Sequence, residues 1–115
     1  MKTNELTGEA LDLAVAQAMG RKYTDFGWWW DNFNPSTNWA HGGPIIEREK
    51  ITAVAFGSRW EAFREESFAT YLDVNEGEAD SYGPTPLIAA MRCYVASKLG
   101  DEVDVPEELT QGKKK

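Results

Sequence analysis

The segment from Thr85 to Gly100 constrains the fold of this chain most strongly. Thr85 is a typical helix N-cap, Pro86 suits the first helical position because no amide proton is needed there, and Gly100 is typical of a helix end. Between them lies a broad apolar face, formed by Leu87, Ile88, Met91, Val95 and Leu99. Because such a face has to be covered, we expect this helix to pack against a sheet or another helix.

A second helix is predicted over residues 5–19. Thr7 is a suitable cap near its start, and Gly20 is suited to the left-handed position that ends many helices. Apolar residues recur at spacings of three and four, namely Leu11, Ala14, Val15, Ala18 and Met19. This spacing indicates an amphipathic helix with one apolar face.

The periodicity changes after Lys50. Residues 51–56 are rich in β-prone side chains, Gly57 and Ser58 fit a tight turn, and residues 59–64 alternate between charged and apolar types. This pattern predicts a β-hairpin. In its second strand, Trp60 and Ala62 are expected on one face, and Arg59, Glu61 and Phe63 on the other.

A third strand is predicted over residues 67–73, because Phe68, Thr70 and Leu72 alternate and would share one face. The acidic residues and the glycine of segment 75–81 indicate a mobile loop after it.

Three consecutive tryptophans also fit a strand, on which Trp28 and Trp30 share one face and Trp29 takes the other. Taken together, these patterns predict the α+β class. We expect a single small domain over residues 1–105, with about three helices packed on a small antiparallel β-sheet. Residues 106–115 are predicted to be a disordered tail.

Charge and composition narrow the possible partners. The chain has 115 residues and a formal net charge of -7. This charge disfavours direct nucleic-acid binding, because that binding depends on basic side chains that replace counterions. Cys93 is the only cysteine, so a disulfide within the chain is excluded, and no apolar run approaches the ~20 residues that span a bilayer. We expect no membrane association and a location in the cytoplasm.

The stretch 33–49 is the densest in groups that can contact a ligand. Ser36 or Thr37 is a natural N-cap for a helix that begins near Thr37. The run 42–44, Gly-Gly-Pro, then predicts a break or a kink, since proline lacks an amide donor and disfavours helical geometry at the residue before it. A further helical turn is expected from Pro44 to Glu49.

Three pieces of this sequence resemble the NinX-like family of small tailed-phage proteins, whose domain is similar to the phage αβα-sandwich domain. They are residues 14–20, residues 34–47 and residues 83–92, and together they span most of positions 5–105. The family pattern usually has an aspartate where this chain has Asn38. The resemblance implies a phage origin, a small αβ fold and the cytoplasm of an infected bacterium, and it carries no activity.

The sequence favours a protein without catalytic activity. His41 is the only histidine, and no HxxxH or CxxC spacing, nucleophile elbow or phosphate-binding loop accompanies it. Cys93 falls in an apolar helix, where an inert thiol is expected, and Glu47 and Glu49 are typical of a solvated helix face. We therefore expect no cofactor and no metal, and a small hydrolase is retained only as a minor alternative.

The first functional hypothesis is a binding protein for a small, nucleotide-like ligand. Hydroxyls and amides at a helix start suit an anion, aromatic rings suit a planar base, and an arginine supplies charge. The candidate ligand-binding residues are Ser36, Thr37, Asn38, Trp39, Arg48, Trp28 and Trp30. With the phage resemblance, they suggest a sponge that sequesters a nucleotide signal of bacterial defence.

The alternative hypothesis is an acidic inhibitor or adaptor that docks onto a basic host protein. In that case the acidic loop 75–81 and an exposed tryptophan would supply the contacts, with aromatic anchors contributing most of the affinity. The sequence leaves the oligomeric state open.

Overall fold

A computed structural model of the chain describes residues 1–20, 33–74 and 79–104. The helices are η1 (Thr3–Glu5), α1 (Gly8–Ala18), α3 (Trp39–Glu49), α4 (Glu65–Val74) and α5 (Pro86–Leu99), and the strands are β1 (Thr52–Phe56), β2 (Arg59–Phe63) and β3 (Ser81–Gly83). Within these residues, four α-helices accompany a three-stranded antiparallel sheet, which confirms the predicted α+β class.

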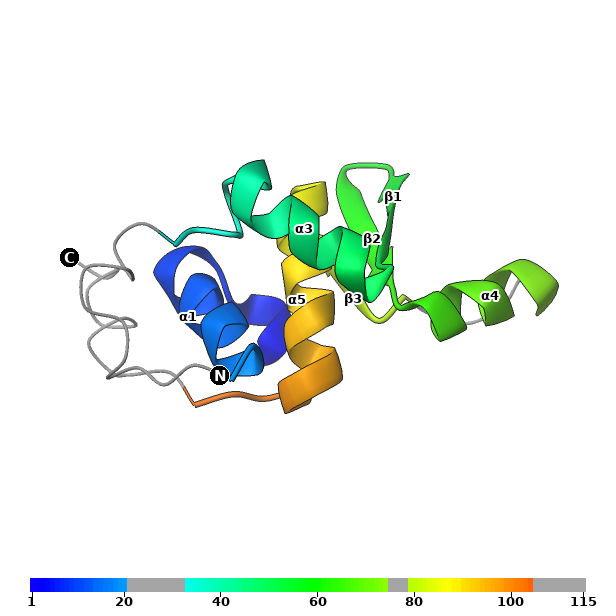
Figure 1. Cartoon of the computed structure of the whole chain (residues 1–115). Helices are drawn as coiled ribbons and strands as arrows, with labels where there is room; N and C mark the ends of the chain where they lie inside the picture. Colours follow the sequence, from blue (N-terminus) through cyan, green and yellow to red (C-terminus); the bar gives the residue numbers. More distant parts are fainter. Residues whose placement is uncertain (21–32, 75–78, 105–115) are drawn as a thin grey trace.

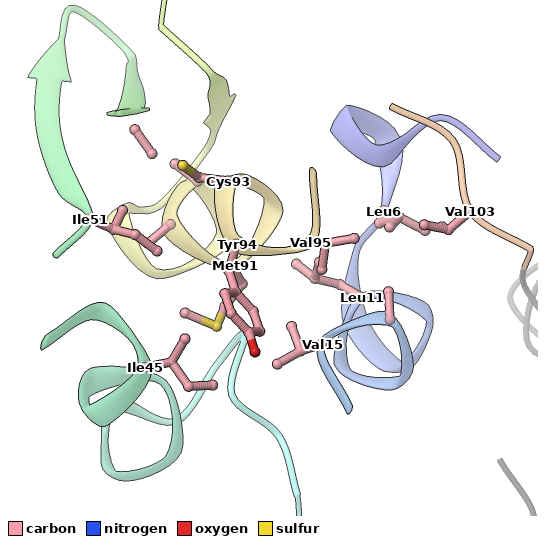
Figure 2. Packing of buried hydrophobic residues seen from close by; sticks show 14 of the residues in the cluster. Leu6, Leu11, Val15, Ile45, Ile51, Met91, Cys93, Tyr94, Val95 and Val103 are labelled. Carbon is pink, nitrogen blue, oxygen red and sulfur yellow. The ribbon is translucent and has the colours of Figure 1, made fainter. Parts of the chain in front are cut away.

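Helix α5 is the centre of the fold. It packs against α1, α3, η1 and all three strands, and Figure 1 shows it between α1 on one side and the sheet on the other. In Figure 2, Met91 and Tyr94 point between Ile45 of α3 and Val15 of α1, whereas Cys93 points toward the sheet. The helix predicted after Thr85 is confirmed, and Thr85 caps it by accepting a hydrogen bond from the Ile88 amide at 3.1 Å.

The sheet has the order β1-β2-β3, and the hairpin forms as predicted. Ala62 is fully buried on the face toward α5, and Trp60 packs against the same core. The opposite face of β2 carries Arg59, Glu61 and Phe63. Phe63 is buried there because the rings of Phe68 and Tyr71 lie within 5.5 Å and 5.3 Å of its own ring.

The third strand predicted over residues 67–73 is wrong, because this segment is the helix α4. The residues also satisfy a helical pattern: Glu65 and Glu66 occupy the first turn, where the helix dipole favours anions. Phe68 and Tyr71, three positions apart, lie on one side of the helix and cover Phe63. Figure 1 shows α4 extending away from the rest of the domain.

A break at the Gly-Gly-Pro run, one of the two outcomes predicted there, does not occur, because α3 continues through Pro44 to Glu49. Proline removes the amide that would donate to the carbonyl of Ala40, four residues earlier. Both residues are exposed, so water can reach that side of the helix. The helix ends at Lys50, which adopts the left-handed conformation with φ 54°.

The predicted strand with Trp28 to Trp30, most of the acidic loop and the C-terminal tail 106–115 lie outside the described residues. None of the helices that the structure describes is long and apolar enough to cross a membrane.

Candidate functional site

The structure places Ser36 and Thr37 in a turn before α3, with their amides already bonded. Ser36 is 1% exposed, and its amide donates to Oδ1 of Asp12 at 2.8 Å. The amide of Thr37 donates to the carbonyl of Asn34 at 3.1 Å. The prediction that Ser36 or Thr37 caps the helix is wrong, because Asn38 is the cap: its Oδ1 accepts from the Ala40 amide at 2.9 Å.

Trp39 and Arg48 lie at opposite ends of α3. At a rise of ~1.5 Å per residue, nine positions separate them by about 14 Å along the helix axis. Trp39 is 56% exposed. Arg48 donates from Nε to Glu49 at 3.0 Å and lies 6.0 Å from the ring of Tyr94; the hydrogen bond to Glu49 raises the pKa of Arg48.

The structure therefore does not bring Arg48 to the turn at 36–39. Trp28 and Trp30, the other two members of the predicted site, lie outside the described residues. The ligand-binding role of this set stays a prediction.

A different part of the surface forms a cleft. Its larger hollow has a volume of about 590 Å³ and lies on the outer face of the sheet, between α4 and the N-terminal segment. A second hollow of about 430 Å³ lies beside η1. Four residues line both hollows, namely Asn4, Asp80, Tyr82 and Asp101, and we call the joined hollows the acidic cleft.

Tyr82 is the main aromatic surface of the acidic cleft. It lies on β3 directly opposite Glu61 of β2, and its side chain stays on the outer face of the sheet, 43% exposed. The guanidinium of Arg59 lies 4.7 Å from the centre of its ring. Phe56, 47% exposed, and Tyr71 add further aromatic surface to the larger hollow.

Carboxylates dominate the charge of the acidic cleft. The acidic lining residues are Glu5, Glu61, Asp80, Asp101 and Glu102, whereas the basic ones are Lys2 and Arg59. Glu61 accepts from Arg59 at 2.6 Å and 3.2 Å. Asp80 accepts from the Arg64 amide at 2.7 Å and from the hydroxyl of Ser67 at 3.1 Å. These two carboxylates are therefore already paired or bonded.

Asp101 differs from these two carboxylates. Its carboxylate forms no ion pair with a residue that the structure describes. Its backbone carbonyl, in contrast, accepts from the amide of Thr3 at 2.7 Å, and the hydroxyl of Thr3 donates to the carbonyl of Gly100 at 2.7 Å. These bonds hold η1 beside the end of α5, so the N-terminal segment forms one wall of the cleft.

Asn4 belongs to that wall and lines both hollows of the acidic cleft. Its Oδ1 is buried, and no described residue donates a hydrogen bond to it. Leaving such an acceptor unpaired costs ~1–3 kcal/mol, which a donor on a bound partner would recover.

The reactive side chains considered from the sequence lie elsewhere. The backbone amide of Asn34 donates to Nδ1 of His41 at 3.1 Å, and the imidazole stacks on Phe33 at 5.6 Å between ring centres. Burial raises the pKa of the Cys93 thiol to about 12, so it is protonated at neutral pH. In the described parts of the chain, no three His, Cys, Asp or Glu side chains are grouped so that they could hold a metal ion.

Sequence reasoning did not find the acidic cleft. The alternation in β2 placed Arg59 and Glu61 on one face, which is the face that lines it. Tyr82 belongs to a strand of three residues, too short to show periodicity. Asn4 and Asp101 are 97 positions apart, and no local pattern indicates that they meet.

The fold and this surface define a small α+β domain with an acidic cleft beside its sheet. The family described as "Bacteriophage P22, NinX" matches residues 2–98, and the chain therefore belongs to this family. Among curated proteins, no match was found.

Proposed function

We propose that this NinX-family protein is a non-enzymatic phage accessory protein that binds a basic segment of a host protein in the acidic cleft. The observation that carries the proposal is the cleft itself, where exposed rings lie among carboxylates that outnumber the cations. The protein would act in the cytoplasm of the infected bacterium.

Charge supports this choice of partner. The whole chain carries a formal net charge of -7, and the cleft concentrates carboxylates on one face. Complementary charge raises the rate at which a basic partner is encountered and disfavours acidic competitors. The same charge opposes nucleic acid, because phosphates would be repelled from this face.

Aromatic surface supports affinity. Interface hot spots are enriched in tyrosine and arginine, and they combine apolar area with a polar contact. Tyr82 and Phe56 are both more than two fifths exposed, at 43% and 47%, although each is large enough to be buried favourably. A partner that covers both rings would remove this apolar area from water and gain the hydrophobic contribution to binding.

Affinity capture from a nuclease-treated bacterial lysate tests the proposal. We expect the full chain to retain a stoichiometric protein, and the variants Y82L and D101N to lose it. W39L and E47Q are matched controls, because they remove an exposed ring and a carboxylate that do not line the acidic cleft. If the control variants lose the host protein to the same extent as Y82L and D101N, the proposal is contradicted. It is also contradicted if Y82L and D101N still retain that protein.

A second candidate function is the binding of a small, nucleotide-like ligand at Trp39, as in a sponge that sequesters a defence signal. The observation that favours it is the 56% exposed ring at the start of α3, where a planar base can stack. Isothermal titration of the full chain with cyclic and ADP-ribose-type nucleotides tests it. A heat of binding that is lost in W39L and retained in Y82L supports this candidate. If none of these nucleotides gives a heat of binding with the full chain, the candidate is contradicted.

A further inference from the structure

We infer that the acidic cleft recognises an arginine side chain, rather than any cation, in the basic segment that it binds. This inference rests on the proposed function and narrows it to a guanidinium ligand. Three features of the cleft carry it: an arginine already bound on its floor, an unpaired acceptor in its wall, and a carboxylate without a partner among the described residues.

The first feature is Arg59. Its guanidinium lies over the Tyr82 ring, 4.7 Å from the ring centre, while Nη2 and Nε both donate to Glu61, at 2.6 Å and 3.2 Å. The cleft thus already binds one guanidinium by stacking and by a forked hydrogen bond. Both contacts depend on the planar shape and the fixed donor directions of arginine, which an ammonium group lacks.

The second feature is the unpaired acceptor in the opposite wall. Oδ1 of Asn4 is buried without a donor from the described residues, and Asn4 lines both hollows together with Tyr82. A neutral acceptor beside an aromatic ring suits a donor that spreads its charge over several N–H groups. Guanidinium has five such donors and is more weakly hydrated than ammonium, so it loses less when water is displaced.

The third feature is Asp101, which lines the same two hollows and forms no ion pair with a described residue. An arginine that donates to Asn4 has further N–H groups available for this carboxylate. Lys2 is the basic residue that lines the hollow beside η1, and Glu5 and Glu102 line it as well, so the hollow remains acidic. Together, Asn4, Tyr82 and Asp101 offer a neutral acceptor, a ring and a charge.

Titration of the full chain with matched peptides at low ionic strength tests the inference. The probes are an arginine–serine repeat, a lysine–serine repeat of equal length and charge, and a citrulline–serine repeat, in which a neutral urea replaces each guanidinium. We expect the arginine peptide to bind at least about tenfold more tightly than the lysine peptide, which corresponds to about 1.4 kcal/mol. The citrulline peptide is expected not to bind.

Variants connect the peptide result to the acidic cleft. Y82L is expected to remove the preference for arginine, and D101N to weaken both basic peptides, whereas E47Q is expected to leave the titrations unchanged. The thermal midpoint of each variant shows whether it is folded. Because the altered side chains of Tyr82 and Asp101 are exposed, we expect the fold to persist.

The possible outcomes separate this inference from the proposed function. Equal binding of arginine and lysine peptides, or a preference that survives in Y82L, overturns the arginine inference. If neither peptide binds while Y82L and D101N still abolish capture from lysate, the inference is overturned and the proposed function stands. If capture does not depend on the acidic cleft, the proposed function fails in an assay that uses none of these peptides.

Discussion

Arg92 of α5 donates from Nη1 to the backbone carbonyl of Tyr82 at 2.7 Å, which ties the central helix to β3. The same guanidinium donates from Nε to the carbonyl of Leu6, just after η1, at 2.9 Å. One side chain, 6% exposed, therefore positions both walls of the acidic cleft. Burial lowers the pKa of Arg92, but a guanidinium stays protonated in proteins, so its donors remain available.

Substitution of Arg92 by methionine is expected to destabilise the protein by about 2–6 kcal/mol. The reason is that the carbonyls of Leu6 and Tyr82 both lose a donor, and each unpaired buried group costs ~1–3 kcal/mol. Denaturant unfolding measures the change. The matched control is Arg48→Met, whose exposed side chain predicts a change within about 0.5 kcal/mol. Equal effects of the two substitutions would show that Arg92 does not hold the walls together.

Two neighbouring glycines of α3 are expected to respond in opposite directions to alanine. A Cβ on Gly42 would lie 2.5 Å from Cδ1 of Leu87 and 2.5 Å from the carbonyl oxygen of Pro35. Such overpacking costs ~1–3 kcal/mol, which exceeds the gain of up to ~1 kcal/mol that alanine brings to a helix. A Cβ on Gly43 meets only Cε3 of Trp39, at 4.0 Å, so there the gain remains.

Thermal unfolding of Gly42→Ala and Gly43→Ala measures this difference. We expect the first variant to melt below the natural chain and the second above it. If both variants were stabilised, α3 and α5 would not approach each other as closely as the structure places them.

Asn38 is expected to matter for stability as the cap of α3. Its replacement by alanine removes the acceptor for the Ala40 amide and should cost ~1 kcal/mol. Replacement by aspartate retains an acceptor and places a negative charge near the helix start, which is favourable by ~0.3–1 kcal/mol. Denaturant midpoints of the two variants test the order. The control is Ser36→Ala, which leaves the hydrogen bond from the Ser36 backbone amide to Asp12 intact. If Ser36→Ala destabilised the protein more than Asn38→Ala, Asn38 would not be the main cap of α3.

The Cys93 thiol is expected to be unreactive in the folded protein. Burial raises its pKa to about 12, above the ordinary value of 9.0. The folded state therefore keeps the proton at pH values where the unfolded state loses it, and this group lowers stability as the pH rises above about 9. A disulfide reagent at pH 8 should label the thiol only as fast as the protein opens, and denaturant should make labelling immediate. Immediate labelling of the folded chain would contradict the burial.

The sequence and the structure agree where local interactions decide. Thr85 and Pro86 begin α5 through groups within one helical turn, and the alternation of β2 assigns Ala62 to the core and Glu61 to the outer face. They differ where a local pattern allows two outcomes. The residues of α4 alternate like a strand, yet Phe68 and Tyr71 also match the spacing of a helix, and the covered ring of Phe63 favours the helix.

The sequence by itself determined the α+β class, the central helix, the hairpin and the acidic character of this protein, because capping, periodicity and charge are properties of neighbouring residues. Only the tertiary structure decided which polar groups remain available. Asp12 accepts a hydrogen bond from the backbone amide of Ser36, so this amide is no longer available to a ligand at the predicted site. Packing on α5, in turn, brings Asn4, Tyr82 and Asp101 together in one cleft. Such a site depends on contacts between distant segments, which no local pattern encodes.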